Sequence, residues 1–429
     1  MIRPTWFEFR RLWPGRTWPA IAVVSVAALV SFGAVAVTGP VRPLDGDAPE
    51  YLSIAQALAA DKGFVAPLSP WPTQPTMARV PLWPLAAAAA LMLFPADNPR
   101  AVLRYLTALV NVLTSLVLCF LTFSLTADSR LSTAVGLAAG GYPASIFLVV
   151  SGYCELLAVF ILCVGLLAIL AGGRSTYVGM LLLGFVPLVR SNFIILPFCA
   201  LFLLCIVTLK DRNRILKLAE LQRIALCSVL FAMPSLFWLA RNYEISGRFP
   251  LMSTLEGETL YGSNNAVVAN QLAEWGYWIM PNQISGEVPL RELARTMSEV
   301  QVNDYYHQKA LRFWIEHWPT LPKLILGKLV RGFVPIPFKP RLGSYVVFSF
   351  RAIIYVALFF SLWKWPRIDP MYRYFCGSVF LVILITTVIY YGTYRFSYLI
   401  ELSVMPFIAL AVRDQIVQSR GARWCATNG

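Results

Sequence analysis

The chain has 429 residues, of which 58% are hydrophobic and only 14% are charged. Soluble domains average about 25% charged residues, so this composition excludes a soluble globular protein and indicates an all-α polytopic membrane protein. The formal net charge of +14 does not indicate nucleic-acid binding, because the basic residues separate apolar runs and do not cluster with aromatic residues on one soluble domain. The eight cysteines show no CxxC spacing and there are only two histidines, which argues against a disulfide framework or a zinc site.

The first apolar run extends from about Trp18 to Thr38. No small-residue cleavage site precedes it, so we interpret it as an uncleaved first span. Four arginines come before the run, namely Arg3, Arg10, Arg11 and Arg16. Positive charge favours the cytoplasmic side, so the chain is predicted to start in the cytoplasm and to emerge outside after Thr38.

The stretch from Leu44 to Phe64 then predicts a short amphipathic helix on the outer face. Asp47 and Glu50 have the spacing of a capping box, and apolar residues recur from Tyr51 at helical spacing. The helix is too short to cross a bilayer and suits a position along its surface. Asp47 is therefore either a helix cap or a catalytic base held at the membrane face.

A Pro-rich loop carrying Arg79 leads to the apolar run from Leu82 to Phe94. At 1.5 Å per residue this run reaches roughly 20 Å, short of the ~30 Å hydrocarbon core. We interpret it as a re-entrant or surface segment, because basic loops later in the chain would face outward if it crossed.

Under that interpretation the chain has ten spans and both termini are cytoplasmic. The spans lie at about 18–38, 101–126, 131–150, 154–171, 176–189, 192–209, 224–240, 344–363, 374–391 and 396–412. Three parts follow from this topology: an N-terminal transmembrane module (1–240) with its first outer loop (39–81), an extracytoplasmic segment with an interfacial helix (241–343), and C-terminal spans with a cytoplasmic tail (344–429).

The extracytoplasmic segment is predicted to contain a helical stretch around Arg291 to His317. The interfacial helix that follows is expected to turn Lys323, Lys328 and Arg331 toward the lipid headgroups. The two halves of the chain do not mirror each other in span length or loop size, which argues against an inverted-repeat transporter.

Several ionisable residues are predicted to share the outer face. They are Asp45, Asp47, Arg79, Glu155, Arg190, Arg241 and Arg395. Ionisable groups at membrane depth are costly and indicate function, although the arginines also suit snorkelling or interfacial anchoring, and Glu155 a structural ion pair. Together they suit a substrate with an anionic headgroup on an apolar tail, because arginine binds phosphate well.

These residues occur in stretches that resemble the GT-C superfamily of membrane glycosyltransferases, which includes the aminoarabinose transferase of lipid A and the protein O-mannosyltransferases. The matching stretches are GDAPEYLSIAQALAADKGF, ARVPLWPL, SGYCELLAVF, RNYEISGRFPLMSTLEGETLYGSNN and YRFSYLIELSVMPFIAL. The last departs from the family pattern, because Ser397 replaces a second arginine and Leu399 or Ser403 stands where prolines are expected.

The resemblance implies an enzyme of the bacterial inner membrane with its active site on the periplasmic side. The donor would be a sugar, hexosyl or pentosyl, on a polyprenyl phosphate, and the acceptor a glycan, a lipid or a protein. The resemblance places the base at Asp47, with Asp45 as its rival, and the donor phosphate at Arg79 with help from Arg190 and Arg395. It also implies sugar or acceptor contacts, at Glu155, Tyr51, Asn264 and Asn265. No cofactor is assigned, and a divalent metal held by the carboxylates stays open.

Two other classes of protein fit part of the pattern. A flippase or transporter of lipid carriers would place polar residues at the midplane of several spans, whereas these spans read as largely apolar. An O-antigen ligase or polymerase would concentrate arginines and a histidine in its large outer loop. Here His307 and His317 lie in the large loop, but the acidic helix start lies in the first loop.

Overall fold

The computed structural model describes residues 18–39, 42–95, 97–210, 218–248, 252–336, 342–367 and 369–428. Within these ranges the chain is helical, and the one pairing of extended backbone is an isolated bridge between Val65 and Pro75. The predicted all-α fold is confirmed. The N-terminal arginines and most of the basic loop after Lys210 lie outside the described residues.

The α-helices of the first half follow the predicted hydrophobic runs, except that the runs 131–150, 176–189 and 192–209 are each broken into two helical pieces. The α-helices are α2 (Trp18–Thr38), α3 (Ala48–Ala59), α4 (Leu82–Leu93), α5 (Pro99–Thr126), α6 (Ser129–Gly140), α7 (Pro143–Ser151), α8 (Glu155–Ala171), α9 (Ser175–Gly184), α10 (Leu196–Lys210) and α11 (Leu218–Ser246). The second half supplies α12 (Glu256–Gly262), α13 (Ala266–Asn270), α14 (Leu290–Leu293), α15 (Glu299–Glu316), α16 (Leu321–Phe333), α17 (Leu342–Ser361), α18 (Pro370–Ile389) and α19 (Tyr394–Asn428). Short 3-10 helices join them, η1 (Val186–Leu188), η2 (Ser191–Ile195), η3 (Pro281–Gln283), η4 (Trp318–Thr320) and η5 (Leu362–Arg367).

Six of the described helices are long and apolar enough to cross a membrane, so the chain is an integral membrane protein. They are α2, α5, α11, α17, α18 and α19. The pair α6 and α7 is bent by 43° and adds a seventh if it forms one span. Shorter apolar helices occupy the remaining predicted spans, and α4, at 12 residues, is also short. The total of ten spans stays a prediction.

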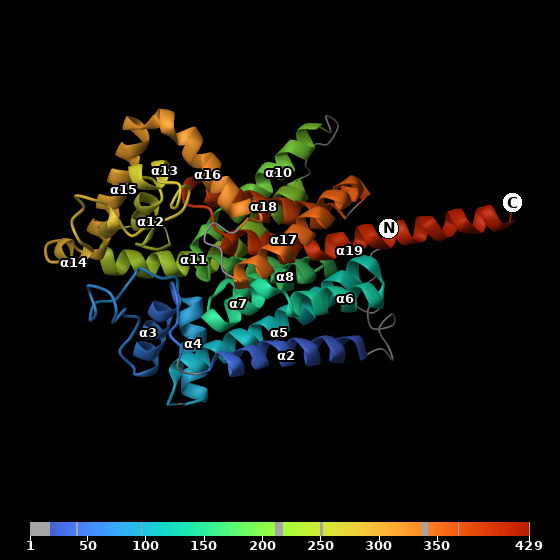
Figure 1. Ribbon diagram of the computed structural model, residues 1–429, viewed down its shortest axis with the longest axis horizontal. Helices are drawn as coiled ribbons and strands as arrows, with labels where there is room; N and C mark the ends of the chain where they lie inside the picture. Colours follow the sequence, from blue (N-terminus) through green and yellow to red (C-terminus); the bar gives the residue numbers. More distant parts are fainter. Residues whose placement is uncertain are drawn as a thin grey trace.

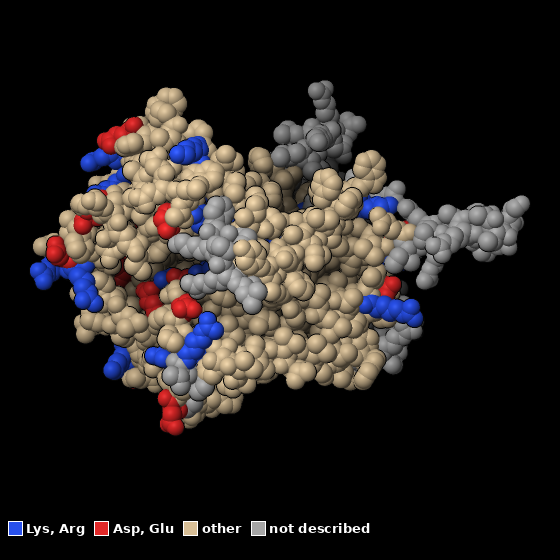
Figure 2. Space-filling view, viewed as in Figure 1, with Lys and Arg blue, Asp and Glu red and all other residues tan. Residues whose placement is uncertain are grey.

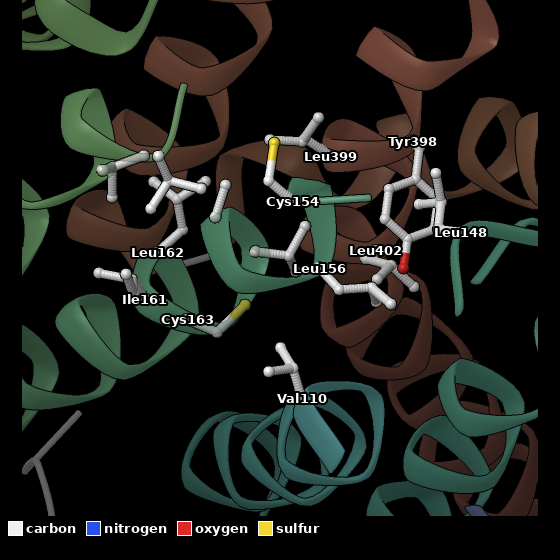
Figure 3. Packing of buried hydrophobic residues seen from close by; sticks show 14 of the residues in the cluster. Val110, Leu148, Cys154, Leu156, Ile161, Leu162, Cys163, Tyr398, Leu399 and Leu402 are labelled. Atoms are coloured by element: carbon white, nitrogen blue, oxygen red, sulfur yellow. The ribbon is translucent and has the colours of Figure 1, made fainter. Parts of the chain in front are cut away.

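The bundle is divided between a buried centre and an apolar rim. In the most apolar stretch of α19, 78% of the residues are buried. In the corresponding stretches of α2, α11 and α17, only 22%, 22% and 17% are buried. Apolar side chains left exposed on a bundle are what lipid tails cover. In the centre, side chains of α5, α8 and α19 interdigitate, with Val110, Leu156 and Leu402 among them (Figure 3).

The helices of the bundle run along the long axis of the molecule, and a cap covers one end (Figure 1). The cap comes from two segments far apart in sequence, α3 with α4 and α12 to α15, while the C-terminus lies at the opposite end. On the face shown in Figure 2, charged side chains gather at the two ends, and the surface between them is almost free of charge. The predicted helical stretch in the cap is two helices, because Ser298 starts α15 with a capping box to Gln301.

The prediction that Lys328 and Arg331 face lipid headgroups is wrong. Both are buried in α16, whereas Lys323 is exposed. The Lys328 ammonium donates hydrogen bonds to the Asn264 side chain (2.7 Å) and to two backbone carbonyls at the end of α18. The Arg331 guanidinium donates to the backbone carbonyls of Trp275 and Ala273. These donors satisfy carbonyl groups that the helix ends and loops leave unpaired.

Candidate active site

Asp47 stands at the start of α3, but it does not cap the helix. Its backbone is already helical (φ −80°, ψ −17°) and its side chain makes no capping hydrogen bond. The reading of Asp47 as a helix cap is therefore wrong, and its carboxylate is free to turn inward. Gly46 permits this turn with φ +59°, and a Cβ at that position would clash with the Tyr153 hydroxyl.

An alternating series of carboxylates and guanidiniums extends from Asp47 through the cap end of the bundle. We call it the ion-pair network, and its six members are Glu50, Arg79, Asp47, Arg395, Glu155 and Arg190. It contains three arginines and three carboxylates, so its formal charge is zero. Its members come from α3, the loop before α4, the start of α8, the residue before η2 and the first turn of α19.

The first half of the network fixes Asp47 between two arginines. Arg79 donates from Nε to Glu50 Oε2 (2.8 Å) and from Nη2 to Asp47 Oδ1 (3.1 Å). Arg395 donates from Nη2 to the other oxygen of Asp47, Oδ2 (2.9 Å). Both oxygens of the Asp47 carboxylate thus accept charge-assisted hydrogen bonds.

The second half centres on Glu155, which is fully buried. Its Oε1 accepts from Arg395 Nε (2.7 Å) and from Arg190 Nη1 (3.0 Å). The sequence left a structural ion pair open as one role for Glu155, and Glu155 does form ion pairs with these two arginines. The Arg395 guanidinium also stacks on the Tyr153 ring, 3.9 Å from its centroid.

A cavity of about 160 Å³ opens beside this network. Figure 2 shows acidic and basic side chains in a hollow at the capped end. Four of the predicted site residues line the cavity, namely Asp47, Tyr51, Arg79 and Arg190. Polar groups that sequence reasoning did not assign complete the wall, among them Asn192, Ser253, Glu256, Thr259, Thr386 and Tyr390.

The other predicted site residues do not line the cavity. Arg395 and Glu155 lie behind Asp47 and hold it through the network. Asp45 is exposed and outside the cavity wall, so the structure separates it from its rival Asp47. Asn264 and Asn265 are also absent from the wall.

Both asparagines hold the fold together. The Asn264 amide donates to the backbone carbonyls of Leu260 and Ile389 and its oxygen accepts from Lys328. The Asn265 oxygen caps α13 by accepting from the backbone N–H groups of Val267 and Val268. Asn264 is 1% exposed and Asn265 is 2% exposed, and their expected contact with sugar stays a prediction.

Electrostatics make Asp47 a weak base. Burial raises the pKa of Asp47, but the guanidiniums of Arg79 and Arg395 outweigh burial and hold this pKa well below its usual range. A carboxylate with a low pKa has little tendency to accept a proton from a hydroxyl group. The role of Asp47 as general base stays a prediction, and its partners favour a role in placing the arginines.

The sequence also missed a buried arginine that supports the first outer loop. Arg104 of α5 is 1% exposed and donates to four backbone carbonyls, those of Gly39, Arg42, Pro43 and Val150. It ties the end of α7 to the chain that leads into α3. The signal was a second arginine four residues after Arg100, inside an apolar helix.

The sequence left open whether the carboxylates of the site hold a divalent metal. In the part of the chain that the structure describes, no three His, Cys, Asp or Glu side chains converge as a metal site requires. Glu50, Asp47 and Glu155 each face an arginine.

The fold that carries this site is a known one. The chain has the GT-C fold, the transmembrane architecture that the sequence resemblance predicted. No protein-family model and no curated protein sequence matches the chain.

Two solved structures with this fold are of the Archaeoglobus fulgidus oligosaccharyltransferase, in the apo form and tethered to an acceptor peptide containing the NVT sequon. Both match with a TM-score of 0.56 and 13% identity, over 96% and 97% of this chain and 52% and 51% of theirs. The chain therefore spans about half the length of these structures. ArnT from Cupriavidus metallidurans also matches, at 14% identity over 91% of this chain and 76% of its own, with a TM-score of 0.43. At such identities the likeness shows the fold alone.

Proposed function

We propose that the chain is a glycosyltransferase that moves a sugar from a polyprenyl-phosphate donor to a hydroxyl group of a glycan, lipid or protein acceptor. The reaction would take place on the extracytoplasmic side of a bacterial inner membrane. One observation carries the proposal: the guanidiniums of Arg79 and Arg190 and the carboxylate of Asp47 share the wall of a cavity at the end of an apolar bundle.

The two arginines on the wall keep donors available for a phosphate. A guanidinium has five N–H groups in a fixed fork. Within the described residues, carboxylates accept hydrogen bonds from Nε and Nη2 of Arg79 and, on Arg190, from Nη1 alone. The remaining N–H groups suit phosphate oxygens, which guanidinium binds with matching planar geometry. The apolar rim of the bundle supplies a surface along which a polyprenyl tail fits.

The chemistry would be a displacement at the anomeric carbon. The acceptor oxygen attacks that carbon from the side opposite the phosphate, and the bond from carbon to phosphate oxygen breaks. The bonding electron pair moves to the phosphate, whose growing negative charge Arg79 and Arg190 stabilise. The sugar inverts its anomeric configuration, and the acceptor hydroxyl loses its proton to a base.

Transfer of label by the purified protein tests the proposal. The donors would be undecaprenyl-phosphate-linked glucose, mannose and aminoarabinose, each radiolabelled, with a bacterial membrane-lipid extract, lipopolysaccharide and a peptide mixture as acceptors. We expect label to move from at least one of these donors, and Arg79→Ala to abolish the transfer. No transfer from any of them, together with no binding of undecaprenyl phosphate, would overturn the proposal.

A parallel reaction addresses the second enzyme class that the sequence left open. An O-antigen ligase or polymerase uses a lipid-diphosphate donor, so undecaprenyl-diphosphate-linked glycan is included as a donor. Transfer from the diphosphate alone would move the protein to that class. Movement of lipid carrier across a vesicle membrane without transfer would instead indicate a flippase.

A further inference from the structure

Transfer to a hydroxyl group requires a base that accepts its proton. The carboxylates of the ion-pair network are weak bases, because each is paired with arginine. Each oxygen of Asp47 accepts a hydrogen bond from a guanidinium. One oxygen of Glu155 accepts from two guanidiniums, and Glu50 accepts from one. A carboxylate in that position is stabilised as an anion, so protonating it would also break an ion pair. The base must be sought elsewhere on the cavity wall.

Glu256 is the carboxylate on the wall outside this network. It opens α12, the first helix of the cap segment that reaches the cavity from the second half of the chain. It is half-buried, and no cation pairs with it in the part of the chain that the structure describes. Ser253 and Thr259 flank it on the wall and carry hydroxyl groups.

The surroundings of Glu256 tune it for proton exchange near neutral pH. Burial disfavours the charged form and raises the pKa of Glu256 to about 7. The titratable groups that share the cavity wall with it are Asp47, Tyr51, Arg79, Arg190, Tyr390 and Tyr391. On the other side of α12, Tyr306 of α15 lies near Glu258, and His307 lies against Gly257. The guanidiniums among them, those of Arg79 and Arg190, pair with Asp47 and Glu155 of the network.

We propose that Glu256 is the general base that takes the proton of the acceptor hydroxyl, and that Asp47 and Arg395 position the arginines which hold the phosphate. This inference rests on the proposed glycosyltransferase function. As the acceptor oxygen bonds to the anomeric carbon, its proton passes to the Glu256 carboxylate, which becomes a neutral carboxylic acid. The electron pair of the broken bond leaves with the polyprenyl phosphate. Glu256 then releases its proton to water, and the site is restored.

The assignment divides the cavity into two functional walls. The wall that carries Arg79 and Arg190 holds the departing phosphate, and the α12 wall receives the acceptor beside Glu256. The leaving group and the base must lie on opposite sides of the anomeric carbon in an inverting displacement. Separation of the base from the guanidiniums also lets its affinity for a proton stay close to the working pH.

The test compares three carboxamide variants with the donor that the wild-type protein transfers. Glu256→Gln should lower turnover by a factor of about 10² to 10⁴ while leaving the affinity for undecaprenyl phosphate unchanged. Glu258→Gln is the matched control, since Glu258 lies on the same helix but is not among the residues that line the cavity, and it should turn over normally. Asp47→Asn should lower turnover only about tenfold, or about 1.4 kcal/mol, through misplaced arginines.

The dependence of turnover on pH separates the two candidate bases. In the wild-type protein turnover should rise with pH about a midpoint near 7, because Glu256 acts as a base only when ionised. Asp47→Asn should keep this rise and Glu256→Gln should lose it. Glu256→Asp should retain both part of the turnover and the rise, and it covers the case in which the glutamine variant does not fold.

An infrared titration gives a readout that does not need turnover. In the wild-type protein, the part of the carbonyl band of protonated carboxyl groups that belongs to Glu256 should disappear near pH 7. This part should be missing in Glu256→Gln and kept in Glu258→Gln. Normal turnover of Glu256→Gln, or a rise that survives in it but is lost in Asp47→Asn, would return the base to Asp47 and overturn the inference. If the wild-type protein transfers no sugar, the proposed function fails first, and the inference falls with it.

Discussion

Among the residues that the structure describes, two clusters of arginine and carboxylate differ in what surrounds them. The ion-pair network lies beside the cavity, where the side chains of Asp47 and Arg79 are 29% and 18% exposed. The second cluster lies inside the bundle, where Arg351 of α17 and Glu401 of α19 are 0% and 1% exposed and 2.6 Å apart.

The buried cluster is enclosed by the protein. Arg351 donates to Glu401, to the Ser397 hydroxyl and to the Gly332 carbonyl, and Glu401 accepts from the hydroxyl groups of Tyr142 and Tyr355. No ligand can reach these groups. By contrast, the side chains of Arg79 and Arg190 line the cavity and are 18% and 13% exposed. The comparison teaches that access, more than charge, separates a binding ion pair from a structural one.

The largest effect is expected on removal of one partner of the buried pair. Arg351→Met leaves the Glu401 carboxylate buried without compensation, which typically costs about 3–5 kcal/mol of unfolding free energy. Thermal unfolding of the purified protein in detergent measures the loss. The matched control is Arg248→Met, because Arg248 pairs with Asp304 at the surface, where such pairs contribute about 0–1 kcal/mol. Equal shifts for the two variants would mean that burial does not distinguish the clusters.

The next effect concerns phosphate at the cavity. Arg79→Ala should weaken binding of undecaprenyl phosphate by about 2–5 kcal/mol, the usual cost of removing one partner of a desolvated charge pair, while thermal stability falls less than in Arg351→Met. Arg79→Lys should also bind weakly, because a point charge lacks the guanidinium fork. Equilibrium binding of labelled undecaprenyl phosphate checks both variants. Normal affinity in Arg79→Ala would remove Arg79 from the phosphate site.

The third effect, the smallest when taken per pH unit, involves Lys328, a buried cation whose hydrogen bonds go to the Asn264 side chain and to two backbone carbonyls. Burial lowers the pKa of Lys328 to about 7 in the folded protein, whereas an unfolded lysine holds its proton up to about pH 10.4. Between these values the unfolded chain binds more protons, so unfolding free energy should rise with pH, by at most about 1.4 kcal/mol per unit. Lys328→Met should flatten this rise in thermal unfolding measured at neutral and alkaline pH. An unchanged slope would show that Lys328 stays charged.

The sequence predicted where the charges would gather but not how they would pair. Hydropathy located the apolar helices, and charge parity put Asp47, Arg79, Glu155, Arg190 and Arg395 at one end, where the structure finds them. Pairing depends on helix packing between segments hundreds of residues apart. For that reason Asp47 reads as a helix cap in sequence and turns out to face Arg395 in space.

The sequence predictions were wrong where a charged side chain could be placed either at the lipid interface or among buried polar groups. Lys328 and Arg331 lie on an amphipathic helix, a pattern typical of the lipid interface, yet buried carbonyl groups bind them. Arg351 and Glu401 were passed over because each is a single charge in an apolar run, although such charges imply a buried partner. Glu256 belongs to no motif that the sequence analysis used to assign site residues. Its place on the cavity wall distinguishes it from Glu258, and sequence alone does not show that place.

The bond between Asp47 and Arg395 joins residues 348 positions apart, and this has a consequence for biogenesis. While the chain is being synthesised, the guanidinium that fixes the second oxygen of Asp47 does not exist until α19 emerges from the ribosome. Contacts of such long range form late and slowly. A nascent or truncated chain lacking α19 would therefore carry a loose Asp47 and no assembled phosphate site. Under the proposed function, activity would therefore depend on complete membrane insertion of α19.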